Sequence, residues 1–163
     1  MWQSILTEKI FDSNEKLAKQ VMSWQIHNEK VVFTNGCFDI LHLGHIDYLA
    51  KAADLGDRLI IGVNTDSSVS SIKGPSRPVI DELTRATKLA ALLFVDAVIL
   101  FGEDTPLTLI EAVKPDVLVK GGDYTIDTIV GADAVLARGG TVDVIPFLPG
   151  HSTTAIIDKI KAE

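Results

Sequence analysis

Two histidines three positions apart carry the clearest chemical signal in this sequence. His42 and His45 enclose Gly44 and follow an apolar run, Val31 to Phe33, and a short polar turn. The apolar run predicts a buried strand, and the apolar spacing from Ile46 onward predicts a helix. Imidazoles donate to phosphate oxygens, and a helix start adds unpaired backbone N–H groups and the positive end of the helix dipole. The segment therefore predicts a phosphate-binding site.

A structural role would explain a single histidine at this position equally well. Either imidazole alone can be a helix cap or a buried structural group. The His-x-Gly-His spacing directly after a strand favours function, because Gly44 lacks a Cβ and lets a ligand approach the backbone. The chain's single cysteine, Cys37, lies in the preceding turn. It excludes an internal disulfide, and we interpret it as a small packed residue.

Three further polar clusters lie after predicted strands or before predicted helices. Asn64 to Asp66 follow one strand, Lys120 to Asp123 follow another, and Ser152 to Thr154 precede the last helix. The carboxyl ends of parallel strands share one edge of a sheet, where ligands bind. Gly121-Gly122 can equally be a tight turn. An N-cap needs only one hydroxyl, so three in a row favour a second anion site.

The segment 67–81 is rich in Ser, Gly and Pro and is predicted to be a long loop. It carries Lys73 and Arg77. Two cations beside a phosphate site favour a mobile clamp, although an ordinary solvated loop also explains them.

Predicted strands and helices alternate along the chain. Five strands without hairpin signals predict an α/β fold with a doubly wound, five-stranded parallel sheet of Rossmann-like topology. Residues 1–30 are predicted to be a helical segment packed on the sheet, with Asp12 and Glu15 resembling a capping box. The predicted strands span residues 31–33, 58–63, 96–101, 116–119 and 141–146.

Length and composition narrow the class of protein. The 163 residues, 47% hydrophobic and 23% charged, fit a single globular domain, 1–163. A net charge of −7 argues against nucleic acid as a partner. No signal peptide is evident, and the most apolar stretch is too short to cross a membrane. We expect a cytoplasmic protein, with a symmetric homodimer as the default assembly.

The segment from Gly36 to His45 resembles the signature of the cytidylyltransferase-like nucleotidyltransferases. Within that family, the order of the later motifs is similar to the bacterial D-glycero-β-D-manno-heptose 1-phosphate adenylyltransferases. Val119 to Tyr124 is the most specific of these motifs. The resemblance implies transfer of AMP from ATP to a sugar 1-phosphate, giving ADP-heptose for the lipopolysaccharide core and pyrophosphate. Many members carry a fused sugar-kinase domain; none is present here, so we expect the stand-alone form.

The same resemblance implies roles for individual residues. His42 and His45 hold the ATP phosphates and stabilise the transition state, and Lys73 bridges the reacting phosphates. Mg²⁺ accompanies ATP and is held mainly by phosphate oxygens, with no dedicated protein metal site. Nucleotide or phosphate binding is implied for Thr34, Asn35, Gly36, Cys37, Phe38, Gly44, Lys120, Gly121, Gly122, Asp123, Ser152, Thr153 and Thr154. Substrate binding is implied for Asp39, Asn64, Asp66 and Arg77, with Asp39 orienting substrate or metal.

Two positions depart from the family's pattern. Thr84 precedes Arg85 where an acidic residue is common, and His151 precedes the Ser-Thr-Thr segment. Neither Arg85 nor His151 is therefore given a role.

Two alternative functions remain open on the sequence alone. A cytidylyltransferase acting on glycerol 3-phosphate or a similar small phosphate shares the first motif and the Ser-Thr-Thr ending, and spacing does not separate ATP from CTP. A non-catalytic nucleotide-binding module is the second alternative. Both histidines, Lys73 and Ser-Thr-Thr count against it, because binding alone does not need them all.

Overall fold

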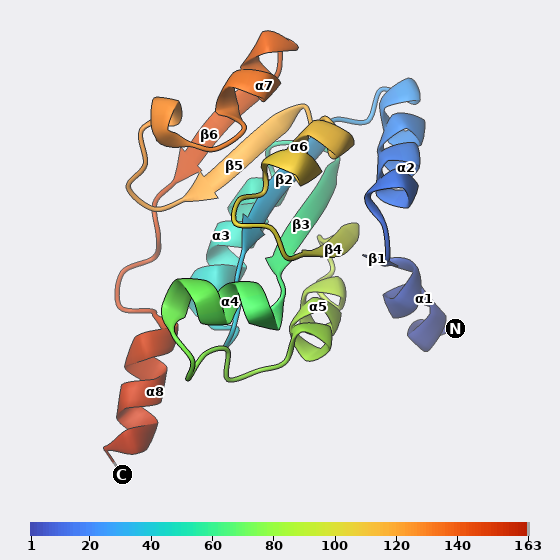
Figure 1. Ribbon diagram of the computed structural model, residues 1–163. Coiled ribbons are helices and arrows are strands. Elements are labelled where there is room, and N and C mark those ends of the chain that lie inside the picture. Colours follow the sequence, from blue (N-terminus) through green and yellow to red (C-terminus); the bar gives the residue numbers. More distant parts are fainter. Residues whose placement is uncertain (163) are drawn as a thin grey trace.

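Six parallel strands form the sheet that positions the site (Figure 1). The computed structural model describes residues 1–162. The sheet order is β1-β4-β3-β2-β5-β6. The predicted α/β fold with a parallel sheet is confirmed, but the predicted number of five strands is wrong. A two-residue strand at one edge adds the sixth, and two residues are too few for a recognisable apolar pattern. The strands are β1 (Ile10–Phe11), β2 (Val31–Gly36), β3 (Arg58–Asn64), β4 (Ala97–Phe101), β5 (Val117–Gly121) and β6 (Thr141–Ile145).

The central strand β2 is the point where the sheet changes its direction of growth. β3 and β4 are added on one side of β2, whereas β5 and β6 are added on the other. Phe33 of β2 pairs with Leu118 of β5, so Asn35 and Lys120 lie two residues further on, near the carboxyl ends of both strands. In open parallel sheets this switch point opens the crevice that holds the ligand.

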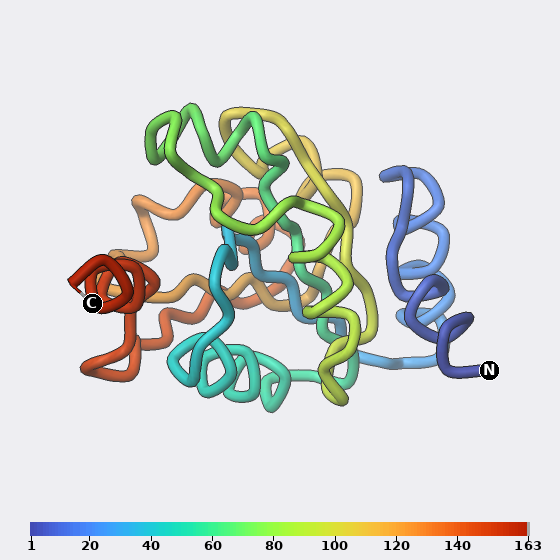
Figure 2. The backbone as a smooth tube through the Cα atoms, turned by 90° about the horizontal axis from the view of Figure 1, so that it is seen from below, coloured from blue at the N-terminus to red at the C-terminus, as the bar shows by residue number. Residues whose placement is uncertain are grey.

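Helices cover both faces of the sheet (Figures 1 and 2). On one face, Phe33 packs in a core with the helices α2 (Asn14–Ile26), α6 (Leu107–Val113) and α7 (Ala132–Ala137). On the other face, Val32 packs in a second core with α3 (Leu43–Ala53) and α5 (Glu82–Ala90). Strands buried on both faces explain the nearly continuous apolar runs in the sequence.

Two helices lie at the carboxyl-end rim. Helix α4 (Asp66–Lys73) occupies the first half of the segment predicted to be a loop, which corrects that prediction. Its N-cap, Thr65, accepts a hydrogen bond from the Ser68 backbone N–H. A serine-rich helix with little apolar surface has no clear periodic signal, so sequence patterns miss it. Helix α8 (Thr153–Lys161) extends from the rim and has no buried residue (Figure 1). A 3₁₀ turn, η1 (Ile126–Thr128), follows β5.

The N-terminal segment also differs from its prediction. Instead of one helical stretch, α1 (Trp2–Glu8), β1 and α2 follow one another. Ser13, rather than Asp12, caps α2 by accepting from the Lys16 backbone N–H. Asp12 instead pairs with the Lys16 side chain at 2.6 Å. Within residues 1–162, no helix is both long and apolar enough to cross a membrane.

Candidate functional site

Two adjoining hollows open at the carboxyl ends of β2 and β5. The first, here called the groove, has a volume of about 550 Å³. The second, here called the pocket, has a volume of about 380 Å³. Both are lined by the same five residues, here called the shared rim: Asn35, Gly36, Cys37, Lys120 and Tyr124. Molecules bound in the two hollows would therefore meet at one short stretch of backbone and one lysine.

The groove brings together most of the residues that the sequence singled out. They come from β2, α3, α4, β5 and the start of α8, which are far apart in the chain. These groove residues are Asn35, Gly36, Cys37, Phe38, Asp39, His45, Lys73, Lys120, Gly121, Gly122, Asp123 and Thr153. Three aromatic residues, Tyr48, Tyr124 and Phe147, complete the lining.

The loop after β2 is held in a strained but supported shape. β2 continues through Gly36, although the polar residues from Thr34 were expected to end it. Thr34 is fully buried, and its hydroxyl lies 2.6 Å from that of Tyr48, a contact that satisfies a polar group inside the strand. Phe38 has a positive φ of 47°, and its ring lies where a Cβ on Gly36 would be, at 2.9 Å. A side chain at position 36 would push the Phe38 ring from its place.

The two motif histidines lie against each other at the start of α3. Their ring centroids are 3.8 Å apart, and the Phe38 ring meets His45 edge-on at 5.4 Å. The Nδ1 atoms of His42 and His45 are buried and have no hydrogen-bond partner among residues 1–162. A buried nitrogen without a partner is costly, and a hydrogen bond to a ligand would remove that cost.

Burial disfavours the charged form of both imidazoles in the free protein. Burial lowers the pKa of His45 to about 4, and the charges of His42 and Lys73 act in the same direction. Burial, followed by the charge of His151, lowers the pKa of His42 below its ordinary value. An incoming phosphate would reverse this balance, because an anion favours the protonated form of both rings.

Asp39 is buried, with 2% of its surface exposed. Its carboxylate accepts hydrogen bonds from Arg77 Nε at 2.6 Å and from the backbone N–H groups of Val79 and Ile80. Burial alone would raise the pKa of Asp39, but these bonds hold it below its ordinary value. Asp39 thus fixes the 77–80 segment against the motif loop and has little capacity left for a ligand.

Arg85, which the sequence left without a role, is 1% exposed and ties three parts of the site together. It donates to the carbonyl oxygens of Cys37 and Ile80 and to Asp66 Oδ1. Arg85 touches the back of the shared rim but lines neither hollow. The signal that would have revealed it is spatial, since its partners lie 5 to 48 positions away.

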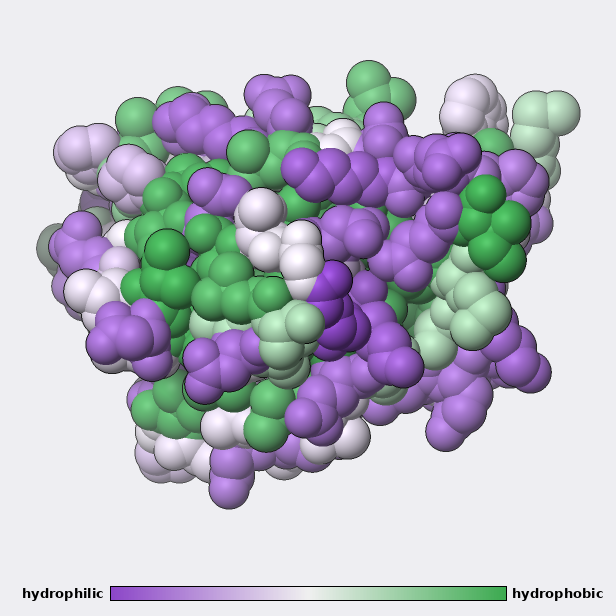
Figure 3. Space-filling model, turned by 90° about the horizontal axis from the view of Figure 1, so that it is seen from above, coloured by the Kyte–Doolittle hydropathy of each residue, from purple (hydrophilic) through white to green (hydrophobic). Residues whose placement is uncertain are grey.

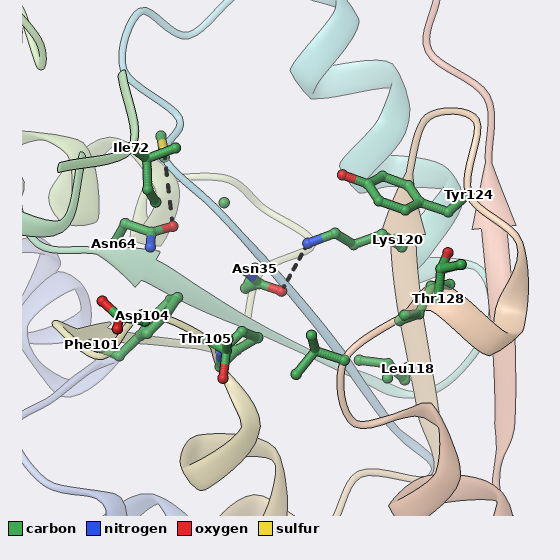
Figure 4. Close-up of a pocket in the computed structure, with 15 residues that line it drawn as sticks. Asn35, Asn64, Ile72, Phe101, Asp104, Thr105, Leu118, Lys120, Tyr124 and Thr128 are labelled. Atoms are coloured by element: carbon green, nitrogen blue, oxygen red, sulfur yellow. Dashed lines mark hydrogen bonds between the residues drawn. The ribbon is translucent and has the colours of Figure 1, made fainter. Parts of the chain in front are cut away.

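Lys120 is the cation at the junction of the two hollows. Its Nζ lies 3.4 Å from Asn35 Oδ1 and 5.7 Å from the centre of the Tyr124 ring (Figure 4). Among residues 1–162 no carboxylate pairs with it. Burial lowers the pKa of Lys120, so a bound phosphate would relieve an unpaired, partly desolvated charge.

The pocket contains side chains that sequence reasoning did not select. Asp104 and Thr105, in the loop after β4, line the pocket together with Asn64 and the shared rim (Figure 4). Asn64 donates from Nδ2 to Ser68 Oγ at 2.9 Å, which leaves its amide oxygen near Cys37. Apolar side chains, among them Phe101 and Leu118, form the walls. In the sequence, the one sign that Asp104 and Thr105 could contact a ligand is that their loop follows the carboxyl end of a strand.

The remaining predicted residues lie beside the hollows rather than in their lining. Thr34, His42 and Gly44 line neither hollow. Asp66 accepts a hydrogen bond from Arg85, and Arg77 donates one to Asp39. Ser152 caps α8, accepting from the Ala155 backbone N–H, and Thr154 follows it on the exposed side.

A larger hollow, of about 660 Å³, lies at the opposite end of the sheet. Its lining includes Lys30, Asp116 and Gly140, at the amino ends of strands, and none of the predicted site residues. Hydrophilic and apolar side chains alternate in patches on this face (Figure 3). The chemistry of the motif and the rule for parallel sheets both place the candidate site at the carboxyl ends.

Fold and site together define a Rossmann-like nucleotide-binding protein with a His-x-Gly-His motif at the start of α3. A family model described as cytidylyltransferase-like matches residues 33–159. The chain belongs to this family, which confirms the resemblance seen in its motifs.

Individual relatives agree with this assignment. The bifunctional protein HldE of Magnetococcus marinus is 49% identical over 98% of this chain and 34% of its own length. The protein of the same name from Methylobacillus flagellatus is 56% identical over 90% of this chain and 30% of its own length. The chain thus spans about a third of these relatives. A solved structure, the lipopolysaccharide core biosynthesis protein of Thermoplasma volcanium, is 33% identical with a TM-score of 0.59, covering 74% of this chain and 97% of that one.

Proposed function

We propose that this protein is a nucleotidyltransferase that transfers AMP from ATP to D-glycero-β-D-manno-heptose 1-phosphate. The shared rim carries the proposal. Two hollows of 550 and 380 Å³, both in the usual range of about 300–1,000 Å³ for small-ligand sites, open onto the same backbone and the same lysine. Two phosphate ligands, one in each hollow, would have their reacting groups brought together at Lys120.

ATP occupies the groove in this proposal. His45, Lys73 and Thr153 line it and provide donors for the phosphates. Phe147 is 58% exposed, and its ring lies against Gly121, where an added Cβ would be only 2.5 Å away. An exposed aromatic ring held over glycine backbone is a suitable surface for a flat base.

Heptose 1-phosphate occupies the pocket. A heptose presents several hydroxyl groups, each of which can donate and accept a hydrogen bond. Asn64, Asp104 and Thr105 offer an amide, a carboxylate and a hydroxyl to match them (Figure 4). The phosphate of the sugar then faces the shared rim.

The reaction needs no general base. A phosphate oxygen of the sugar, already anionic, attacks the α-phosphorus of ATP. The bond from the α-phosphorus to the bridging oxygen breaks, and pyrophosphate leaves with the electron pair, so no proton has to move. The protein's task is to hold two anions together and to stabilise the charge that develops between them. Lys120, with its charge, and the imidazoles, with their N–H donors, are suited to that task.

Mg²⁺ is proposed to accompany ATP, where it neutralises charge on the phosphates. Within residues 1–162, no cluster of three or more possible side-chain ligands is present. Asp39 is already occupied, and Asp123 is the other carboxylate that lines the groove. This donor set fits an ion held mainly by phosphate oxygens and water.

Cellular location and assembly complete the proposal. We infer that residues 1–163 act as one catalytic domain in the cytoplasm, a location consistent with a single free cysteine at the site. A homodimer is supported by large apolar side chains on the surface, including Trp2 and Leu93. Light scattering on the purified chain tests this, and a monomeric mass at micromolar concentration would exclude a stable dimer.

Pyrophosphate release tests the function directly. ATP and CTP are each paired with heptose 1-phosphate and with glycerol 3-phosphate, using the purified chain. Release with ATP and heptose 1-phosphate alone is expected. Release only with CTP would show that the protein is a cytidylyltransferase instead. No release with any pair would reject the proposed reaction.

A further inference from the structure

Three of the chain's four histidines gather beside the groove. The third, His151, lies outside the His-x-Gly-His motif and has no role in the reaction described above. Its ring is nearly parallel to that of His42, with an angle of 23° and centroids 6.5 Å apart. His42 in turn lies 3.8 Å from His45. The three imidazoles form a row.

Local packing holds His151 in this row. A Cβ on Gly44 would lie 3.1 Å from the His151 Cβ and 3.1 Å from two ring atoms of His42. The absence of a side chain at Gly44 thus lets both histidines approach the start of α3. Thr153 donates from Oγ1 to the Ile40 carbonyl oxygen at 3.4 Å, which ties the start of α8 to the motif loop. Because α8 has no buried residue, these contacts at its first turn fix its position.

The row leads from the groove toward solvent. His45 lines the groove, His42 lies behind it, and His151 is exposed at the surface. A triphosphate whose α-phosphorus lies at the shared rim would extend past His45 first. Its outer phosphates would then reach the end of the row, where α3 and α8 both begin.

We propose that His151 binds the outer phosphates of ATP and the pyrophosphate formed from them. The inference rests on the proposed function for its triphosphate, but not on the identity of the acceptor. His151 provides an N–H donor at the surface, next to the free backbone N–H groups of two helix starts. Pyrophosphate is held there after the bond to the α-phosphorus breaks and leaves toward solvent.

The electrostatics of the row agree with an anion at this position. The charged or titratable groups that face one another are His42, His45, Lys73 and His151. After burial, the charge of His151 disfavours protonation of His42, and the charges of His42 and Lys73 disfavour protonation of His45. A bound polyanion offsets that repulsion and favours the charged forms of His42 and His45.

Binding of inorganic pyrophosphate, measured by calorimetry, separates ligand binding from packing. His151→Phe keeps the Cβ beside Gly44 and an aromatic ring but removes both nitrogens. His27→Phe makes the same change at an exposed histidine on the distant end of α2. We expect His151→Phe to weaken pyrophosphate binding by about tenfold, the loss typical of one charge-assisted hydrogen bond, and His27→Phe to leave it unchanged.

Equal affinity of wild type and His151→Phe would overturn the proposal, as would a wild type that fails to bind pyrophosphate. A second measurement does not depend on the variant folding. In the wild-type protein, the imidazole NMR signals of His42, His45 and His151 should shift on addition of pyrophosphate, whereas that of His27 should not. An unmoved His151 signal would also reject the inference. If pyrophosphate binding depends on His151 but no heptose reaction is found, only the proposed acceptor is wrong.

Discussion

Lowering the pH should destabilise the ligand-free protein through His45. Its pKa is lowered from 6.5 to about 4 by burial and by the charges of His42 and Lys73. Between these two values the unfolded chain binds a proton that the folded chain does not. Stability therefore rises with pH in this window. The contribution of neutral His45 is fully present above pH 6.5, is lost as the pH falls, and reaches its limit below about pH 4.

The size of the effect follows from the shift. The pKa of His45 in the folded chain lies about 2.5 below its value in the unfolded chain. Since one pKa unit is worth 1.36 kcal/mol, this difference corresponds to about 3 kcal/mol in the free energy of unfolding. Partial exposure of the ring screens the charge and reduces this to about 2 kcal/mol. Such a loss is a large fraction of the stability of a typical domain, which is about 5–15 kcal/mol.

Urea unfolding of wild type and His45→Asn at about pH 7.5 and pH 4.5 measures this contribution. The wild type should lose about 2 kcal/mol more than His45→Asn between the two pH values, whereas His27→Asn should follow the wild type. Saturating pyrophosphate should narrow the gap, because the anion favours protonated His45. Parallel losses in wild type and His45→Asn would refute the claim that His45 is held neutral in the fold.

Four further predictions concern the site. His42→Ala should lower turnover by roughly two orders of magnitude with folding intact, and near-normal turnover would remove His42 from the mechanism. Lys73→Ala should impair catalysis more than stability, because an exposed lysine supports little packing; an unchanged rate with a lower melting temperature would contradict this. Asp39→Ala should cost about 3 kcal/mol or more, since it leaves Arg77 and two backbone N–H groups without their acceptor, and a melting temperature equal to wild type would disprove that role. Chelation of Mg²⁺ with EDTA should abolish pyrophosphate release, and full activity in EDTA would reject the metal proposal.

Local patterns predicted those parts of the fold that are buried on both faces of the sheet. The apolar runs at β2, β3, β4, β5 and β6 are regular enough to give strands, and their alternation with helices gives the parallel sheet. Helix α4 and strand β1 were missed because neither has an apolar pattern long enough to recognise. Both depend on tertiary contacts, such as the pairing of Ile10 with Val98.

Motifs predicted the groove better than the pocket. The residues expected to bind phosphates lie in short segments with unusual composition, such as the one around Gly44, so the sequence marks them. Asp104 and Thr105 are ordinary loop residues until the sheet places them opposite Asn64. Arg85 is a similar case, because its three partners come together only in the folded chain.

A structure of the protein with ADP-heptose bound would test the central claim most directly. The account predicts the adenine against Phe147 in the groove, the diphosphate at the shared rim beside Lys120, and the heptose in the pocket near Asp104. A product lying wholly within the groove, with the pocket empty and Lys120 free of the diphosphate, would contradict the division into two hollows that the proposed reaction requires.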